Sequence, residues 1–312
     1  MIWIVSVVAI VVTTYIFVDR VLRSLKVGNY EDKYVLVTGC DSGFGQELAK
    51  RLDSLGFHVF AGCLTQDGRE YLAKNCSKRL VTVQLDVSKA ESVEAALELV
   101  KRTLPQNRGL WGLVNNAGIT GNMSVSELCT REDYVTALNI NLLGLIEMTR
   151  TFLPLIRVAK GRVINMASIC GRIAIFAPPY TVSKFGVEGY TDLLRRELYL
   201  RGVSVILLEP GAFMTPIFNV ERLTEQVRVS YNKATSEVKD TYGDVPAKFK
   251  LGIEKVIECG SSDTSLVVNC YVHGLTSKYP RTRYIVGHDA LVTYLPLCYL
   301  PTRISDWVLR CV

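Results

Sequence analysis

This chain of 312 residues has few histidines, and its cysteines and histidines do not follow the spacing of metal ligands. Its three histidines, His58, His273 and His288, are isolated from one another. A mechanism built on a histidine base therefore has little support in the sequence. The nine cysteines show no Cys-x-x-Cys or Cys/His ligand spacing, and their odd number fits reduced thiols better than a disulfide framework. We expect no metal site.

A block of basic residues is also missing. The net charge is +6, but lysine and arginine are spread along the chain, and no basic stretch is interleaved with aromatic residues. Such a distribution does not indicate a nucleic-acid partner. The length allows one large α/β domain or two modest ones.

The first apolar run carries no charged residue. Residues 2–18 read IWIVSVVAIVVTTYIFV, a length that sits at the lower limit for crossing a bilayer. A signal peptide would need a basic region before the run and a small-x-small cleavage site after it, and neither is visible. We therefore predict a membrane anchor and its flank at residues 1–27.

The charges around this run predict its orientation. Arg20, Arg23 and Lys26 follow it, and the positive-inside tendency then places the body of the chain on the cytosolic side. We expect a location at the endoplasmic reticulum membrane. The sequons at Asn75 and Asn122 would be open to glycosylation if the body were lumenal instead.

Short apolar runs alternate with longer amphipathic stretches after residue 30. Strands are predicted at residues 34–38, 58–63, 81–85, 112–115, 162–167, 203–208 and 284–287. Helical patterns lie between them, among others at residues 46–55, 91–104, 131–157 and 180–199. The strands are too apolar to have a solvent-exposed face. The alternation of strands and helices therefore predicts a parallel sheet with helices on both sides. The expected fold class is α/β, a single doubly wound Rossmann-type domain.

This catalytic domain is predicted to span residues 28–290. Residues 213–250 break the alternation with a polar, helix-prone insertion, which near the ends of late strands often forms a lid over a ligand crevice. An ordinary surface excursion is the alternative. The tail at 291–312 is apolar and aromatic but interrupted by Pro296 and Pro301, which suits contact with a membrane surface. A contact between subunits, such as a homodimer interface, is the alternative for the tail.

A glycine-rich loop ends the first predicted strand. Residues 37–45 read VTGCDSGFG, and a helical pattern begins at once. Glycines at such a turn let a diphosphate approach the N-terminus of the helix, where free N–H groups favour negative charge. The loop therefore predicts a nucleotide cofactor, although its Gly-x-x-x-Gly-x-Gly spacing differs from the more widespread Gly-x-Gly-x-x-Gly.

Tyr180 and Lys184 stand four residues apart behind two prolines that favour the start of a helix. Residues four apart share a helix face, so the two side chains reach one site. An ammonium group nearby and a positively charged nicotinamide both favour the phenolate and lower the pKa of a phenol, which otherwise lies at about 10. We therefore expect Lys184 to lower the pKa of Tyr180.

The order and spacing of three motifs resemble the short-chain dehydrogenase/reductase family over residues 33–290. The motifs are TGCDSGFG in the glycine loop, NNAG at residues 115–118 after the fourth strand, and the Tyr180-x-x-x-Lys184 pair. Within that family, the TGCDSGFG and GCLT runs and the LPLCYLPTRISDW tail look like the membrane-bound retinol dehydrogenases and their relatives that act on 17β- and 3α-hydroxysteroids.

The resemblance implies a role for each matching residue. Tyr180 would take the alcohol proton as hydride passes to nicotinamide, Ser168 would hold the substrate oxygen, and Lys184 would also grip the nicotinamide ribose. Asn141, in its Asn-x-x-Gly context, would support a proton-relay water, whereas Asn139 would face elsewhere on the helix. The residues implied to bind the cofactor, besides Tyr180 and Lys184, are Thr38, Gly39, Asp41, Ser42, Gly43, Phe44, Gly45, Asp86, Asn115, Ala117, Gly118, Pro210, Gly211 and Thr215.

NAD is the expected cofactor rather than NADP. The second strand ends in Cys63-Leu64-Thr65, with neither the acid typical of NAD-dependent members nor a basic residue for a 2′-phosphate. The glycine loop contributes Asp41 and no cation. A 2′-phosphate would therefore find no countercharge.

A lipophilic alcohol is the expected substrate. The anchor, the apolar tail and the residues Phe213, Met214 and Phe218 beside the site favour an alcohol that partitions into bilayers, and the resemblance implies a retinoid or a hydroxysteroid. The sequence does not choose between these two, because a hydrophobic pocket discriminates weakly by shape.

Two alternatives remain open at this point. One is a dehydrogenase of a small hydroxy acid, whose carboxylate would be held by Arg222, Arg228 or Lys233 of the insertion. The other is a catalytically silent lipid-binding or scaffold protein on the same fold. The complete set of asparagine, serine, tyrosine and lysine argues against the silent protein.

Overall fold

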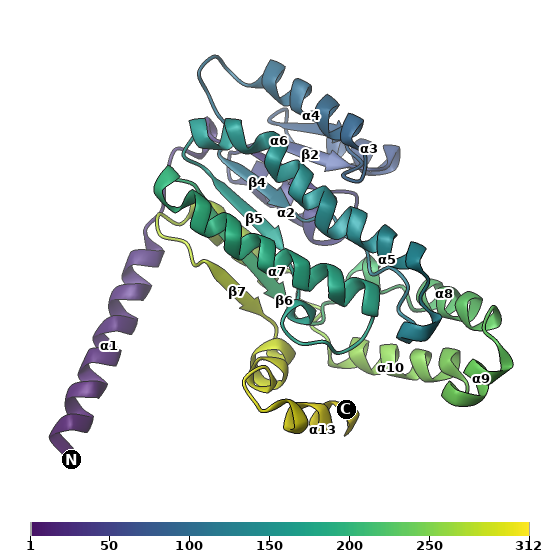
Figure 1. Cartoon of the computed structure of the whole chain (residues 1–312). Coiled ribbons are helices and arrows are strands. Elements are labelled where there is room, and N and C mark those ends of the chain that lie inside the picture. Colours follow the sequence, from purple (N-terminus) through teal and green to yellow (C-terminus); the bar gives the residue numbers. More distant parts are fainter. Residues whose placement is uncertain (1, 312) are drawn as a thin grey trace.

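A seven-stranded parallel sheet forms the centre of the computed structural model, which describes residues 2–311 (Figure 1). The strand order is β3-β2-β1-β4-β5-β6-β7. The strands are β1 (Tyr34–Thr38), β2 (His58–Cys63), β3 (Leu80–Gln84), β4 (Gly112–Asn115), β5 (Arg162–Met166), β6 (Ser204–Pro210) and β7 (Arg283–Val286). The predicted α/β class with a parallel sheet is confirmed, and each predicted strand bound lies within two residues of the observed one.

Helices cover both faces of this sheet (Figure 1). One face packs on α2 (Gly43–Ser54), α3 (Gln66–Asn75) and α11 (Ser265–Thr276). The other face packs on α4 (Ala90–Thr103), α6 (Gly144–Val158) and α7 (Pro178–Leu198). Every residue of β4 and β5 is buried, which explains why these strands do not alternate between exposed polar and buried apolar residues.

The helix predicted at residues 131–157 is interrupted. It consists of α5 (Arg131–Leu138), a π-helical segment (Asn139–Leu143) and α6. The buried side chain of Asn141 in this segment bonds to the backbone of Ile119 instead of facing solvent, whereas Asn139 is exposed. Single π-helical turns of this kind are frequent at functional sites.

The order of the strands reverses between β1 and β4. The chain moves outward from β1 through β2 to β3, and then returns to pair β4 with the other side of β1. Ligands of open parallel sheets bind at such a switch point, beyond the carboxyl ends of the strands. The glycine loop after β1 and the NNAG segment after β4 both lie at this point.

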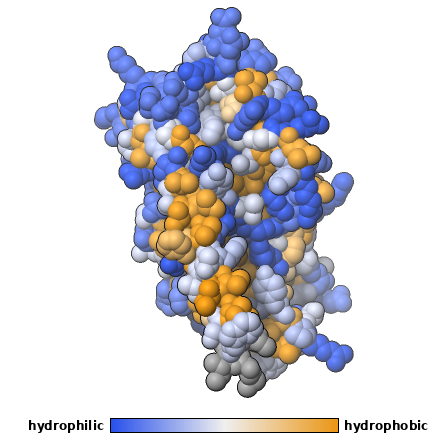
Figure 2. Space-filling model, turned by 90° about the vertical axis from the view of Figure 1, so that its left-hand side faces the viewer, coloured by the Kyte–Doolittle hydropathy of each residue, from blue (hydrophilic) through white to orange (hydrophobic). Residues whose placement is uncertain are grey.

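The N-terminal helix α1 (Ile2–Ser24) extends away from the sheet (Figure 1). Its C-terminal end is fixed to the domain, because Arg281 pairs with Asp19 at 3.2 Å and the Ser277 hydroxyl donates to the carbonyl of Arg23 at 2.8 Å. Figure 2 shows apolar side chains gathered over the lower half of the face on which α1 lies. Among the residues that the structure describes, no helix combines the length and the apolarity needed to cross a membrane.

The insertion after β6 is helical throughout and continues past residue 250 (Figure 1). Its elements are a 3-10 turn (Pro216–Phe218), α8 (Val220–Asn232), α9 (Ser236–Tyr242) and α10 (Val245–Cys259). They stand beyond the carboxyl ends of the strands, on the same side as the switch point. The insertion is therefore placed where it can cover a ligand.

The C-terminal tail packs against the segment that follows β5. It contains a π-helical segment (Asp289–Tyr294), α12 (Leu295–Leu297) and α13 (Thr302–Cys311). Its side chains Ala290 and Leu297 join a buried cluster with Ile169, Cys170 and Ile173. One face of the tail is thus part of the domain, while the other carries exposed apolar side chains such as Trp307, which is 68% exposed.

Asn115 belongs to the interior of the sheet. Its side-chain amide is buried and donates to Thr149 Oγ1 and to Asn165 Oδ1, both at 2.9 Å. Asn165 in turn donates to Thr191 Oγ1 on α7. This buried chain of polar groups links β4 and β5 to the helices above them, and its members would be left unsatisfied by truncation.

We expect Asn115→Ala to lower the free energy of unfolding by about 2–3 kcal/mol, because two buried hydrogen bonds are lost. Urea unfolding followed by circular dichroism measures this loss. Replacement of the exposed Asn75 by alanine is the control and should change stability by less than about 0.5 kcal/mol. An unchanged unfolding midpoint in Asn115→Ala would contradict the assignment of this residue to the core.

Candidate active site

A cavity of about 550 Å³ opens at the carboxyl ends of the strands. Most of the residues implied to form the site line this cavity. They are Gly39, Asp41, Ser42, Gly43, Phe44, Asp86, Ala117, Gly118, Ser168, Tyr180, Lys184, Pro210, Gly211 and Thr215. Four others, Thr38, Gly45, Asn115 and Asn141, lie behind the lining.

The glycine loop packs closely against the segment that follows β4. A Cβ atom at Gly39 would lie 2.8 Å from the Cα of Ala117, so a side chain there would clash with backbone. Gly43 has φ +56°, in the left-handed region, and begins α2. The preceding Ser42 makes no capping hydrogen bond with its side chain. The first N–H groups of α2 are therefore left to a ligand, and the helix dipole favours an anion there.

Asp41 is occupied by the neighbouring loop. Its carboxylate accepts hydrogen bonds from the backbone of Leu64 at 2.9 Å and from the backbone and hydroxyl of Thr65 at 2.8 and 2.6 Å. These bonds tie the glycine loop to the segment after β2. Asp41 therefore shapes the end of the cavity rather than offering a free carboxylate.

Asn116, rather than Asn115, reaches the cavity from the NNAG segment. Its side-chain amide donates to the carbonyls of Thr38 and Gly39, at 3.0 and 3.2 Å. The Thr38 hydroxyl accepts from the backbone of Asn116 and Ala117, both at 3.0 Å. The resemblance implied that Asn115 binds the cofactor, but its side chain points into the core, since alternate residues of a strand face opposite sides.

The position of Lys184 is fixed by burial and one strong contact. Its side chain is only 3% exposed, and Nζ donates to the carbonyl of Met166 at the end of β5, at 2.8 Å. Nζ also lies 5.4 Å from the centre of the Tyr180 ring. Burial lowers the pKa of Lys184 to about 8. The tyrosine and lysine predicted to share a helix face do so on α7, beside the cavity.

Tyr180 and Ser168 meet in front of this lysine. Burial raises the pKa of Tyr180, the neighbouring Cys170 raises it further, and a hydrogen bond with Ser168 lowers it. The expected lowering of this pKa is therefore not found in the chain without nicotinamide, because the loss of solvent around the phenol is the largest effect. Ser168 Oγ also accepts from the backbone of Cys170 at 3.2 Å, and lies 3.5 Å from the carbonyl of Pro210.

Asn141 supports the cavity wall from behind. Its Oδ1 accepts from the backbone N–H of Ile119 at 2.8 Å, and its Nδ2 donates to the carbonyl of Ile119 and to Ser183 Oγ, both at 2.9 Å. Ile119 lines the cavity next to Gly118. The amide of Asn141 thus fixes the segment after β4 against α7.

Asp289 is a site residue that the sequence reasoning missed. Its carboxylate accepts from the backbone of Ala212 at 2.8 Å and fills the space beside Gly211, where a Cβ atom would collide with it. Gly287, with φ +113°, leaves room for it on the other side. No local pattern signals this role, because Asp289 and Ala212 are 77 residues apart in sequence.

The far end of the cavity is apolar. Its lining includes Met123, Ile175, Phe176, Phe213, Ile217, Phe218, Val256 and Tyr294. Phe213 and Phe218 are placed as expected, whereas Met214 lies outside the lining and is partly exposed. Tyr294 comes from the tail, so the insertion and the tail both contribute walls to the cavity.

A glycine loop at the switch point of a parallel sheet, with serine, tyrosine and lysine together beside it, defines a Rossmann-type dinucleotide-binding fold with a dehydrogenase site. A sequence model of the family described as short chain dehydrogenase matches residues 33–226. The chain belongs to this family.

Two dehydrogenases are similar in sequence to this chain over most of its length. Retinol dehydrogenase 7 of Rattus norvegicus is 48% identical over 292 residues, which cover 93% of this chain and 92% of that protein. The 17-beta-hydroxysteroid dehydrogenase type 6 of Homo sapiens is 46% identical over 285 residues, covering 91% of this chain and 89% of that protein. The similarity therefore includes retinol and hydroxysteroid dehydrogenases over most of the chain.

Solved structures share the fold. A short-chain dehydrogenase/reductase from Burkholderia phymatum in complex with NAD gives a TM-score of 0.72 at 20% identity, covering 91% of this chain and 97% of that chain. A 3-ketoacyl-(acyl-carrier-protein) reductase from Brucella melitensis complexed with NADH gives 0.58 at 27% identity, covering 65% and 90%.

The lowered pKa of Lys184 predicts a pH-dependent stability. Between pH 8 and 10.5 the folded chain binds fewer protons at this site than the unfolded chain, so its stability relative to Lys184→Met should rise with pH. The rise should be roughly 2 kcal/mol between pH 7.5 and 9.5, measured by urea unfolding of both proteins without cofactor. A stability difference that stays constant over this range would show that Lys184 is not a buried ammonium group.

Proposed function

We propose that the chain is an oxidoreductase that transfers hydride between a lipophilic alcohol and a nicotinamide cofactor. The observation that carries this proposal is the grouping of Ser168, Tyr180 and Lys184 beside one cavity, between a glycine loop and an apolar wall. Similarity to retinol and hydroxysteroid dehydrogenases supports the same reaction class. A retinoid or a hydroxysteroid is the proposed substrate.

The residues divide the chemistry among them. When bound, oxidised nicotinamide accepts the hydride. Ser168 holds the substrate oxygen, and Tyr180 removes its proton in the oxidative direction or returns it in the reductive direction. Lys184 stabilises the phenolate and binds the nicotinamide ribose, and Asn141 holds Ile119 and supports a proton-relay water. In this proposal the positive charge of the nicotinamide acts together with Lys184 to favour the phenolate of Tyr180.

The cofactor's phosphates are proposed to lie on the N-terminus of α2, with Gly39 and Gly43 giving access. The adenosine end then reaches Leu64, Thr65 and Asp86, all of which line the cavity. NAD is preferred over NADP in this proposal, because the lining at that end carries the carboxylates of Asp41 and Asp86 and no cation among the described residues.

Residues 213–259 are proposed to act as a substrate lid on the catalytic domain at 28–290. Phe213, Ile217, Phe218 and Val256 bring apolar side chains from this segment into the cavity. A lid of this character favours a lipophilic substrate over a small hydroxy acid. Of the three cations considered for a carboxylate, Arg222 lines the cavity and donates to the carbonyl of Ile217 at 3.2 Å. Arg228 pairs with Glu225 on the surface, and Lys233 is exposed after the end of α8.

We expect Tyr180→Phe to lower kcat with retinol or an androstane-type alcohol by at least about 100-fold, because the proton-transferring group is lost. Binding of NADH, followed by fluorescence, should change less than threefold. Turnover of membrane preparations with NAD and with NADP measures the cofactor preference in the same assay.

Three results would overturn this proposal. Full activity in Tyr180→Phe would remove the assigned base. Activity on a water-soluble hydroxy acid but on no retinoid or steroid would identify the small-acid dehydrogenase. Ligand binding without any NAD-linked turnover would identify a silent lipid-binding protein.

We also propose that α1 and the exposed face of the tail attach the chain to the endoplasmic reticulum membrane, with the catalytic domain in the cytosol. The exposed apolar side chains of both segments support this attachment. They include Trp3, Ile10, Phe17, Tyr299, Ile304 and Trp307. A membrane location also suits substrates that partition into lipid.

The two sequons test this orientation unequally. Asn75 is exposed, whereas Asn122 is buried and donates to Ser230 Oγ at 2.8 Å. We therefore expect the chain in microsomes to show no glycosidase-sensitive mass, while the same chain behind a cleavable signal peptide becomes glycosylated at Asn75. Glycosylation of the native chain would reverse the proposed orientation, and release from the membrane by carbonate would contradict firm attachment.

A further inference from the structure

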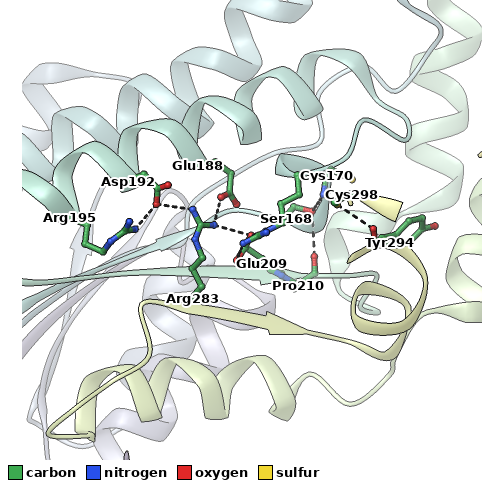
Figure 3. Close-up of polar contacts among 11 residues, drawn as sticks. Ser168, Cys170, Glu188, Asp192, Arg195, Glu209, Pro210, Arg283, Tyr294 and Cys298 are labelled. Carbon is green, nitrogen blue, oxygen red and sulfur yellow. Dashed lines mark hydrogen bonds and ion pairs between the residues drawn. The ribbon is translucent and has the colours of Figure 1, made fainter. Parts of the chain in front are cut away.

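A network of ion pairs lies directly behind the candidate active site (Figure 3). Its centre is Glu209, the fully buried residue before Pro210 at the end of β6. Glu209 binds the guanidinium groups of Arg172 and of Arg283, the latter at 3.2 Å. Arg283 also contacts Glu188 at 2.5 Å and Asp192 at 2.7 Å on α7.

The network joins the segments that supply the site. Arg172 ends the 3-10 turn (Ile169–Gly171) that begins after Ser168. Glu209 precedes Pro210, whose carbonyl lies 3.5 Å from Ser168 Oγ. Glu188 follows Lys184 by one helical turn. The two segments that carry the reacting hydroxyl and ammonium groups are thus tied, through Arg172 and Arg283, to one buried carboxylate at the end of β6.

On α7, the reacting residues and the network residues form one row. Tyr180, Lys184, Glu188 and Asp192 follow one another at intervals of four residues, so they lie along the same side of the helix. Arg283 forms ion pairs with Glu188 and Asp192, the second half of this row. Tyr180 and Lys184, the first half, line the cavity. A rotation or shift of α7 along its axis would therefore break the Arg283 contacts and move Tyr180 together.

We infer that Arg283 is a positioning residue, which sets the placement of Tyr180 and Lys184 against Ser168 through its contacts with Glu188, Asp192 and Glu209. This inference rests on the proposed function for its catalytic readout. Arg283 itself stands outside the cavity lining, so it acts through α7 rather than on substrate or cofactor.

The chemistry of the network suits this role better than a purely stabilising one. Buried ion pairs contribute little net stability, because desolvation of the charges offsets their attraction. Burial and the adjacent Glu209 raise the pKa of Glu188, so a charge on this residue is unfavourable by itself. The fork of Arg283 instead contacts three carboxylates in fixed directions, which sets geometry.

The test compares Arg283→Met, Arg283→Lys and Arg281→Met in the full chain. Arg281 is the matched control, because it stands two residues away and pairs with Asp19 of α1 without touching α7. We expect Arg283→Met to lower kcat per NADH-binding site by 30- to 100-fold, since displacements of about 1 Å have effects of this size. The KM for the alcohol and the Kd for NADH should change less than threefold. Arg283→Lys should recover part of the loss, and Arg281→Met should keep native kcat.

A second measurement is independent of turnover. In chains labelled with 3-fluorotyrosine, the ¹⁹F resonance of Tyr180, assigned by its absence in Tyr180→Phe, should shift or broaden in Arg283→Met and stay unchanged in Arg281→Met. If Arg283→Met does not fold, Asp192→Asn removes the charge of the outer partner, which Arg195 also contacts, and should lower kcat by three- to tenfold.

The outcomes separate the two proposals. Absence of turnover in the native chain refutes the proposed function, and the fluorine resonance then still decides the positioning role. The positioning role is overturned by native kcat and an unmoved Tyr180 resonance in folded Arg283→Met, or by an equal loss in Arg281→Met.

Discussion

The buried ammonium group of Lys184 is the constraint on which the site depends. Its Nζ bonds to the carbonyl of Met166, so α7 must sit at a fixed height against the end of β5. A charged group in such a place is unfavourable by itself, as its lowered pKa shows. The unfavourable burial of this ammonium group comes with the geometry that brings Tyr180 beside Ser168. Stability is given up at the place where the proposed reaction transfers a proton.

Other contacts hold α7 in position around Lys184. Asn141 holds Ile119 at the front of α7, and the ion pairs of Arg283 hold the middle of the helix from behind. Glu209 connects the same pairs to β6, one residue before the Pro210-Gly211 segment of the cavity. The reacting side chains are therefore set by contacts from both sides of α7, and none of them depends on a loop tip for its position.

The cavity separates two kinds of surface. At the glycine loop, the cavity is lined by the first N–H groups of α2 and by the hydrogen-bonded carboxylate of Asp41, where we propose that a dinucleotide binds. At the other end, the insertion and the tail supply apolar walls. Tyr294 makes the tail a contributor to the cavity and not only a surface segment. The inner face of the tail packs on residues 169–173, and its outer face is apolar and exposed. The cavity and the external apolar surface therefore lie on two sides of one short segment.

The sequence by itself determined the alternation of strands and helices, the glycine loop and the Tyr180-x-x-x-Lys184 pair, because these depend on periodicity and on residues close together in the chain. Only the tertiary structure decided that Asn116 and not Asn115 reaches the cavity, that Asp289 packs beside Gly211, and that burial raises the pKa of Tyr180. Strand register, contacts between residues 77 positions apart and the removal of water are set by the packed chain, and no local pattern encodes them.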